Sequence, residues 1–237
     1  MPSKKIYRFR AELFDSEPLI WRQFEVSNDT TLISFCYILM TLFEMRASHL
    51  FSLEFPLGGR GVEQVWRYDY PVEHKCPSYI DEDEEEELGM AAIKLSDIMD
   101  KAGRGFIFVY DFGDNWAVPM EIEYEFVDGK YRSTKYPRVL DGEGYGILEN
   151  CGGVYRLAKI TAAYKKKRGK DYKEFREWLD IDDLDLAAFD KKDMNFRLKK
   201  IPHLYEAIYE GYELDEEDIN LIEREYLYNG GNQNESE

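Results

Sequence analysis

The fold is decided by the stretch Tyr110-Asp111-Phe112-Gly113-Asp114-Asn115-Trp116. Residues 105–109, which precede it, form an apolar run that is typical of a buried strand. Residues 120–126, which follow it, alternate apolar and charged side chains, as a half-buried strand does. The seven residues between them are therefore predicted to be a hairpin tip that carries two carboxylates, an amide and an indole.

Turn chemistry alone explains these residue types. Asp111, Asp114 and Asn115 can accept hydrogen bonds from N–H groups of a turn, Gly113 can supply a positive φ, and Trp116 can cap the core. The triplet at residues 111–113 also matches a protein-kinase motif, but no His-Arg-Asp and no correctly spaced glycine-rich loop occur in the chain. We therefore exclude a kinase.

Working outward, residues 6–14 and 19–26 predict two strands joined by a turn. A helix-start cluster and helical spacing of apolar residues follow up to residue 43, and strands are predicted at 49–55 and 62–70. This order is compatible with a β-grasp-like N-terminal half. Residues 131–146 are expected to be irregular, and helical patterns dominate from residue 153. The sequence thus predicts an α+β protein with a mixed or antiparallel sheet and a mainly helical C-terminal third.

The net charge of −17 is unevenly distributed. Residues 73–100 carry 2 basic and 10 acidic residues, and residues 201–237 carry 1 basic and 11 acidic residues. A block of seven consecutive carboxylates at residues 81–87 repels itself, so a mobile acidic loop is expected at about 73–90. We predict one α+β domain over residues 1–200 and an acidic helical extension with a disordered tail over 201–237.

Composition limits the class of protein further. Hydrophobic residues make up 44% of the chain and aromatic residues 15%, which is enough for a core and excludes wholesale disorder. No apolar run approaches the roughly 18 residues of a membrane span, and the start lacks the apolar segment of a signal peptide, so no membrane and a cytoplasmic location are expected. The acidic total argues against a broad basic surface for nucleic acid.

Carboxylates also gather in a second glycine-rich region, with Asp141, Glu143 and Glu149. If this region meets the hairpin tip, oxygen ligands for a divalent cation would be brought together, with Asp111, Asp114 and Glu149 as the metal candidates. The alternative is two ordinary turns. His49, beside a predicted strand, and Cys151 complete the binding candidates, together with Asn115 and Trp116 of the tip. A divalent cation is the one candidate cofactor.

Short motifs in a fixed order give a resemblance to a known family. They are Trp21-Arg22, Thr31-Leu32, His49-Leu50, Leu95-Ser96-Asp97, residues 110–116, Tyr136-Pro137, residues 140–144, Cys151-Gly152-Gly153, Trp178-Leu179, and Phe189-Asp190 with Asn195. Over roughly residues 5–200 the chain resembles the plasmid pRiA4b Orf3-like family of bacteria and archaea. The resemblance implies an α+β fold, no established activity, and an association of some members with mobile elements.

The chain departs from the pattern of that family at three positions. Typical members have a His where this chain has Val118, an Asp where it has Asn150, and often a His in the first helix where it has Cys36. If the site of the family uses those groups, this chain is a degenerate member.

Three functions remain open from the sequence. The favoured hypothesis is a non-catalytic binding or scaffold module that engages an unknown protein or small molecule through residues 111–116 and 141–153. The first alternative is a divalent-metal-dependent hydrolase or nuclease. The second is a mobile-element-associated accessory protein that binds DNA, which conflicts with the charge. Whether the protein is an enzyme is left open, since no nucleophile–base pair is recognisable.

Overall fold

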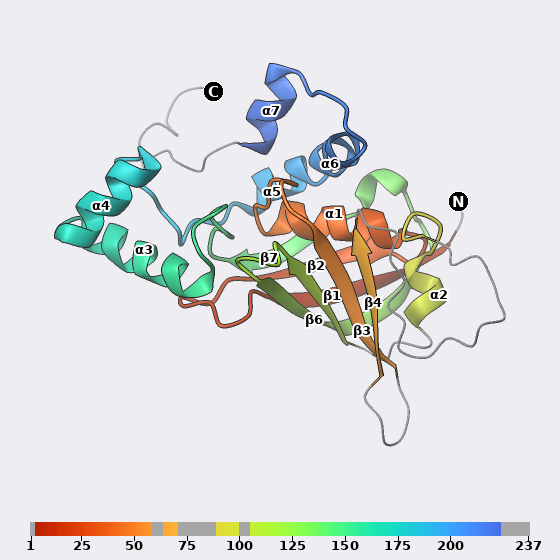
Figure 1. Cartoon of the computed structure of the whole chain (residues 1–237). Helices are drawn as coiled ribbons and strands as arrows, with labels where there is room; N and C mark the ends of the chain where they lie inside the picture. Colours follow the sequence, from red (N-terminus) through yellow and green to blue (C-terminus); the bar gives the residue numbers. More distant parts are fainter. Residues whose placement is uncertain (1–2, 58–63, 71–88, 100–104, 224–237) are drawn as a thin grey trace, which may run out of the picture.

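The computed structural model describes residues 3–57, 64–70, 89–99 and 105–223 (Figure 1). The strands are β1 (Lys4–Glu12), β2 (Trp21–Ser27), β3 (Phe51–Leu57), β4 (Gln64–Tyr70), β5 (Gly105–Tyr110), β6 (Trp116–Asp128) and β7 (Arg138–Glu143). The α-helices are α1 (Leu32–Leu42), α2 (Leu95–Met99), α3 (Val154–Lys166), α4 (Lys170–Leu179), α5 (Lys191–Arg197), α6 (Ile201–Tyr209) and α7 (Glu216–Ile222). Within these ranges no helix combines the length and the apolar character that a membrane span requires.

The β5–β6 hairpin is the centre of the molecule. The described strands form one antiparallel sheet in the order β4-β3-β5-β6-β1-β2-β7. β5 pairs with β3 on one side, and β6 pairs with β1 on the other. The α+β class, the antiparallel sheet and the mainly helical C-terminal third are confirmed. The predicted order of strand, strand, helix, strand, strand is also present, and its two hairpins are separated in the sheet by β5–β6.

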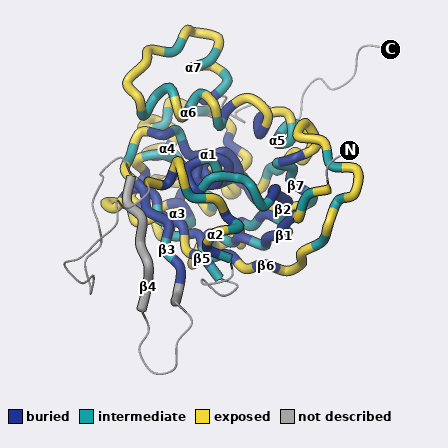
Figure 2. The backbone as a smooth tube through the Cα atoms, turned by 90° about the vertical axis from the view of Figure 1, so that its right-hand side faces the viewer, coloured by how far each residue is buried: buried dark blue, intermediate teal, exposed yellow. Residues whose placement is uncertain are grey.

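Helix α1 lies between the sheet and the C-terminal helices (Figure 1). Its N-cap, Thr31, accepts a hydrogen bond from the Ser34 backbone N–H, and nearly every residue of the helix is buried, as its dark blue colour in Figure 2 shows. A helix that is apolar on all sides needs cover on all sides. Phe35 packs on the rings of Phe9 and Phe106 from the sheet. The opposite side is covered by α6, which therefore belongs to the packing of the core.

Two features of α5 and α6 connect the C-terminal third to the rest of the protein. Arg197 forms a fully buried ion pair with Glu44, just beyond the end of α1. Tyr209 stacks on Tyr37 of α1 with ring centroids 5.9 Å apart, and Tyr205 donates a hydrogen bond to the Met45 carbonyl. The predicted extension thus begins with a helix that is packed on α1. The predicted acidic loop lies outside the described residues except for its last two, and so do residues 224–237 of the predicted tail.

Two boundaries differ from the expectation. Residues 138–143, expected to be irregular, form the edge strand β7, which pairs with β2 in the register Gln23–Asp141. Its Asp-Gly-Glu sequence weakened the strand pattern, because glycine and acidic residues are depleted in strands. β6 begins at Trp116 rather than at residue 120, so the hairpin tip is shortened to residues 111–115.

The burial of Trp116 gives a test of the hairpin as a core element. Its side chain is 1% exposed, at the start of β6. Trp116→Ala should lower the free energy of unfolding by about 3–5 kcal/mol, since it removes a large buried ring and leaves a cavity. Urea unfolding measures the loss. The control is Trp178→Ala, because the side chain of Trp178 is 44% exposed; equal losses in both variants would contradict the assignment.

The buried Glu44–Arg197 pair gives a second test. Arg197→Met should lower the free energy of unfolding by about 3–5 kcal/mol, because Glu44 is left buried without its partner charge. The double variant Glu44→Gln/Arg197→Met should recover a substantial part of that loss. A double-mutant cycle by urea unfolding isolates the pairwise energy. Simple additivity of the two single substitutions would show that the pair contributes no coupling.

Candidate functional site

The hairpin tip is held by its own backbone. Asp111 and Asn115 both have a φ of 54°, and the Asn115 N–H donates to the Asp111 carbonyl at 2.6 Å. The Gly113 N–H donates to Asp111 Oδ1 at 2.9 Å, which closes an Asx turn. The expectation that Gly113 supplies the positive φ is wrong; Asp111 and Asn115 supply it, as Asp and Asn tolerate this region best after glycine.

The second glycine-rich region meets the tip directly. Asp114 Oδ2 accepts a hydrogen bond of 2.9 Å from the Gly152 N–H. Gly153, which precedes α3, has a φ of 81°, and a Cβ at this position would lie 2.9 Å from the Asp114 carbonyl oxygen. Only glycine allows both the conformation and this close approach. The loop at residues 149–153 is therefore locked against the tip.

A third segment, just before β3, adds a histidine. His49 Nε2 lies 3.5 Å from Asp111 Oδ2 and 3.5 Å from Glu149 Oε2. The imidazole meets the ring of Tyr110 edge-on with centroids 5.6 Å apart. Its backbone is fixed from the other side, because Tyr209 of α6 donates to the His49 carbonyl at 2.6 Å. We call His49, Asp111 and Glu149 the His–carboxylate cluster.

Glu149 is the most buried member of the cluster, with a side chain 8% exposed. Its Oε1 accepts from the Arg46 N–H at 2.7 Å and from the Tyr110 hydroxyl at 2.8 Å. Its Oε2 and the Nε2 of His49 are buried and have no hydrogen-bond partner among the described residues. Burial raises the pKa of the Glu149 carboxyl, and the Arg46 N–H opposes that shift.

The hydroxyl of Tyr110 is the part of the site that sequence reasoning missed. Burial raises the pKa of this phenol well above its usual value, so it remains a proton donor to Glu149. Its hydroxyl also accepts from the Ser48 N–H at 3.0 Å. The sequence offered one signal, a tyrosine at the end of an apolar strand next to the polar tip, since a buried tyrosine needs a partner for its hydroxyl.

The remaining predicted site residues lie elsewhere or have other roles. Asp141 and Glu143 are exposed on β7, on the face away from the core, because Gly142 between them faces Arg22 and Phe189. Trp116 is buried and Asn115 is exposed. Cys151 is a buried free thiol that contacts the Gly153 carbonyl at 3.7 Å, and burial raises its pKa to about 12.

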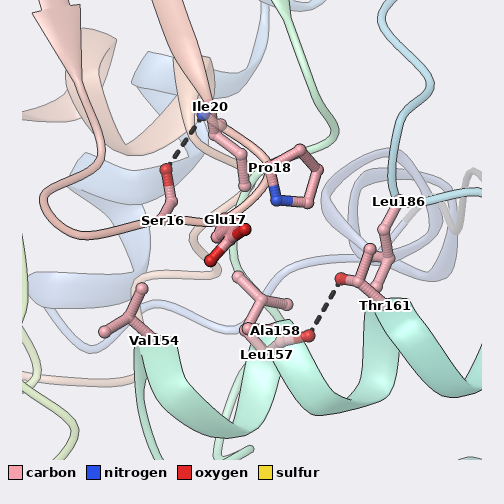
Figure 3. A pocket seen from close by; sticks show the side chains of 9 residues that line it. All are labelled: Ser16, Glu17, Pro18, Ile20, Val154, Leu157, Ala158, Thr161 and Leu186. Carbon is pink, nitrogen blue, oxygen red and sulfur yellow. Dashed lines mark hydrogen bonds between the residues drawn. The ribbon is translucent and has the colours of Figure 1, made fainter.

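The hollows of the surface lie away from the cluster. Figure 3 shows one between the β1–β2 turn and α3, where Leu157 and Leu186 face Pro18. Its volume for water is about 0 Å³, so it is packing and not a binding pocket. A hollow of about 530 Å³ on the open face of the sheet is lined by Ile107, Pro119 and charged neighbours. The cluster is thus a closed polar centre and not the wall of one of these hollows.

The fold and the site together define an α+β protein with a buried His–carboxylate cluster where three loops meet. The profile of the "Plasmid pRiA4b ORF-3-like protein" family matches residues 5–195, and the chain belongs to that family.

Two similar proteins add no activity. The chain is 24% identical over 190 residues to the uncharacterized protein y4hQ of Sinorhizobium fredii (strain NBRC 101917 / NGR234), which covers 80% of this chain and 89% of that protein. It also resembles the crystal structure of a protein of unknown function, MM3350, from Methanosarcina mazei Go1. The TM-score is 0.64, at 23% identity, over 80% of this chain and 96% of the other. This likeness supports the fold alone.

The pH dependence of stability tests the environment of Glu149. Because its folded-state pKa is raised above 4.5, Glu149 contributes less stability as the pH rises from that value through the raised pKa. Glu149→Gln keeps an oxygen for Arg46 and Tyr110 and removes the titration. The stability of the variant relative to the wild type should therefore increase over this range and then level off.

Thermal unfolding of both proteins between pH 4 and pH 8 measures the difference. Glu143→Gln is the control, because it removes one exposed carboxylate from β7. A difference between Glu149→Gln and the wild type that does not vary with pH would contradict the assigned environment.

Proposed function

We propose that this protein is a non-catalytic binding module that engages a basic segment of a partner protein through the face where the three loops meet. The single observation that carries the proposal is the buried Glu149 Oε2, which has no partner among the described residues and sits in a cluster that neighbouring groups hold rigidly. Rigid loops with conspicuous polar groups are typical of recognition surfaces.

Exposed apolar side chains are found next to the cluster. Phe112 at the apex of the tip is 44% exposed, Leu50 beside His49 is 42% exposed, and Tyr155 near the start of α3 is 76% exposed. Aromatic residues of this kind supply most of the binding energy at protein interfaces, while polar groups set specificity. An apolar rim around a polar centre supports a protein partner.

The charge of the face supports a basic partner. Asp111, Asp114 and Glu149 contribute three carboxylates, and the nearby Arg156 guanidinium lies over the ring of Trp178, 5.2 Å from its centroid. Complementary charge steers association and discriminates against acidic partners. A lysine or arginine of the partner is therefore the group that we expect to approach Asp114, the half-buried carboxylate at the edge of the site.

The alternatives have less support. The thiol of Cys151 is buried and its pKa is raised, which disfavours a covalent mechanism. A divalent-metal-dependent hydrolase remains the second candidate, because His49 lies 3.5 Å from each of two carboxylates. Direct DNA binding is the third, and the net charge of −17 weighs against it. The proposed location is the cytoplasm.

Selection from a random peptide library tests the proposal for a partner segment of any sequence. The immobilised full chain, kept in a chelator, should enrich peptides rich in Lys or Arg that flank an apolar residue. Affinities of the enriched peptides, measured by calorimetry, should fall at least about tenfold in Phe112→Ala, as expected for an interface anchor. Asp114→Asn should weaken binding and reduce its dependence on salt.

The control for the aromatic residue is Phe196→Ala, whose side chain on α5 is 47% exposed. The control for the carboxylate is Asp141→Asn on β7. A library that yields no peptide, or peptides whose affinity is the same in Phe112→Ala and Phe196→Ala, would rule out this face as the binding surface.

A further inference from the structure

We infer that the His–carboxylate cluster is the binding site of a divalent transition-metal cation, Zn²⁺ in particular, with His49 Nε2, Asp111 Oδ2 and Glu149 Oε2 as its ligands. This inference rests on the proposed function, in that it assigns an inorganic cofactor to the same face. It concerns only the closed interior of the face, whereas the peptide is expected to meet the rim.

The first argument is the set of unused atoms. Each carboxylate has one oxygen fixed by donors, since Asp111 Oδ1 accepts from the Gly113 N–H and Glu149 Oε1 accepts from Arg46 and Tyr110. The other oxygens, Oδ2 and Oε2, both face His49 Nε2. Buried polar atoms without partners cost stability, and a bound ion is one of the groups that explain them.

The second argument is size. Each oxygen lies 3.5 Å from Nε2, which is too long for a normal hydrogen bond. It equals the separation of about 3.3–3.6 Å between two ligands of a tetrahedral zinc ion with bonds of about 2.0–2.2 Å. An ammonium group needs more space, because its hydrogen bonds are longer than zinc–ligand bonds.

The third argument is the chemistry of the donors and their supports. One imidazole with two carboxylates suits Zn²⁺ or Mn²⁺ better than Ca²⁺ or Mg²⁺, which favour oxygen alone. The Tyr110 hydroxyl and the Arg46 N–H hold Glu149 in the way that outer-shell groups hold metal ligands. Cys151 is not a ligand, because its thiol is turned to the Gly153 carbonyl.

The ligands are close together but not preassembled. Within the described residues, no three His, Cys, Asp or Glu side chains already have the mutual arrangement of a metal site. His49 is close to both carboxylates, and two carboxylates repel each other while no cation lies between them. We therefore expect a small closing movement of Asp111, on the short tip, when the ion binds.

Calorimetric titration of the chelator-treated full chain with Zn²⁺, in the absence of peptide, tests the inference. One saturable equivalent is expected, with an affinity that falls as the pH is lowered, because protons compete for the ligands. Loss of an outer-shell partner costs about 10–100-fold in metal affinity, so Tyr110→Phe should weaken binding by that range and Glu149→Gln by at least as much. Mg²⁺ and Ca²⁺ should bind far more weakly.

The controls separate this site from the acidic segments of the chain. Glu143→Gln and Asp141→Asn remove carboxylates from the open face and should leave the affinity unchanged. Circular dichroism checks that each variant folds, and Asp111→Asn, which keeps the Oδ1 acceptor, replaces Glu149→Gln if the latter does not. The optical spectrum of the Co²⁺ form should show nitrogen and oxygen ligands without a thiolate band.

Absence of saturable binding, equal affinity in Glu149→Gln and Glu143→Gln, or a thiolate band that disappears in Cys151→Ser would overturn the inference. The two proposals fail separately. Peptide binding in chelator with no zinc site would leave the binding module intact, and a zinc site without any peptide would leave the metal alone.

Discussion

The buried guanidinium of Arg22 is the interaction on which the rest of the structure depends. Arg22 is completely buried in β2, and its five N–H bonds all point at backbone carbonyls. Nε donates to Leu42, Nη1 to Trp21 and Glu143, and Nη2 to Gly144 and Tyr145, at 2.6–2.8 Å. The rings of Phe43 and Phe189 lie 5.5 Å and 4.4 Å from the guanidinium carbon. A lysine has neither the planar geometry nor enough donors to replace it. One side chain thus joins β2, the end of α1 and the segment that leaves β7.

The site is built on the two segments that Arg22 brings together. After Leu42 the chain runs to His49, and after Tyr145 it runs to Glu149. They stay in contact between these points, because the Ile147 N–H donates to the Phe43 carbonyl at 3.0 Å and the Arg46 N–H donates to Glu149. Gly146 has a φ of 147°, and a Cβ there would lie 2.4 Å from the Phe43 carbonyl oxygen, so no larger residue fits. The hairpin tip then closes the site through the bond between Asp114 and Gly152.

Local patterns in the sequence predicted the elements well, and the convergence of the site poorly. The apolar run of β5 and the alternation in β6 depend only on neighbouring residues, which is why the central hairpin could be predicted. Residue types also identified Asp111, His49 and Glu149 as candidates, but with equal weight they identified Asp141 and Glu143. The difference between the two sets depends on the register of β7 against β2 and on the contacts of Arg22, which link residues more than 100 positions apart. An arginine at an inward position of a strand was the one visible sign of that frame.

The site places a demand on this frame that a purely structural core would not. A buried polar atom left without a partner costs about 1–3 kcal/mol, and the cluster contains two such atoms, His49 Nε2 and Glu149 Oε2. Side chains with freedom to move would turn these atoms toward water. They are prevented from doing so on three sides, by Tyr110 from β5, by the Arg46 backbone, and by Tyr209 of α6, which holds the His49 carbonyl. The packing of α6 on α1 therefore supports the site as well as the core. Because any group that satisfies the cluster binds only the folded state, its occupancy stabilises α6 and the hairpin tip together.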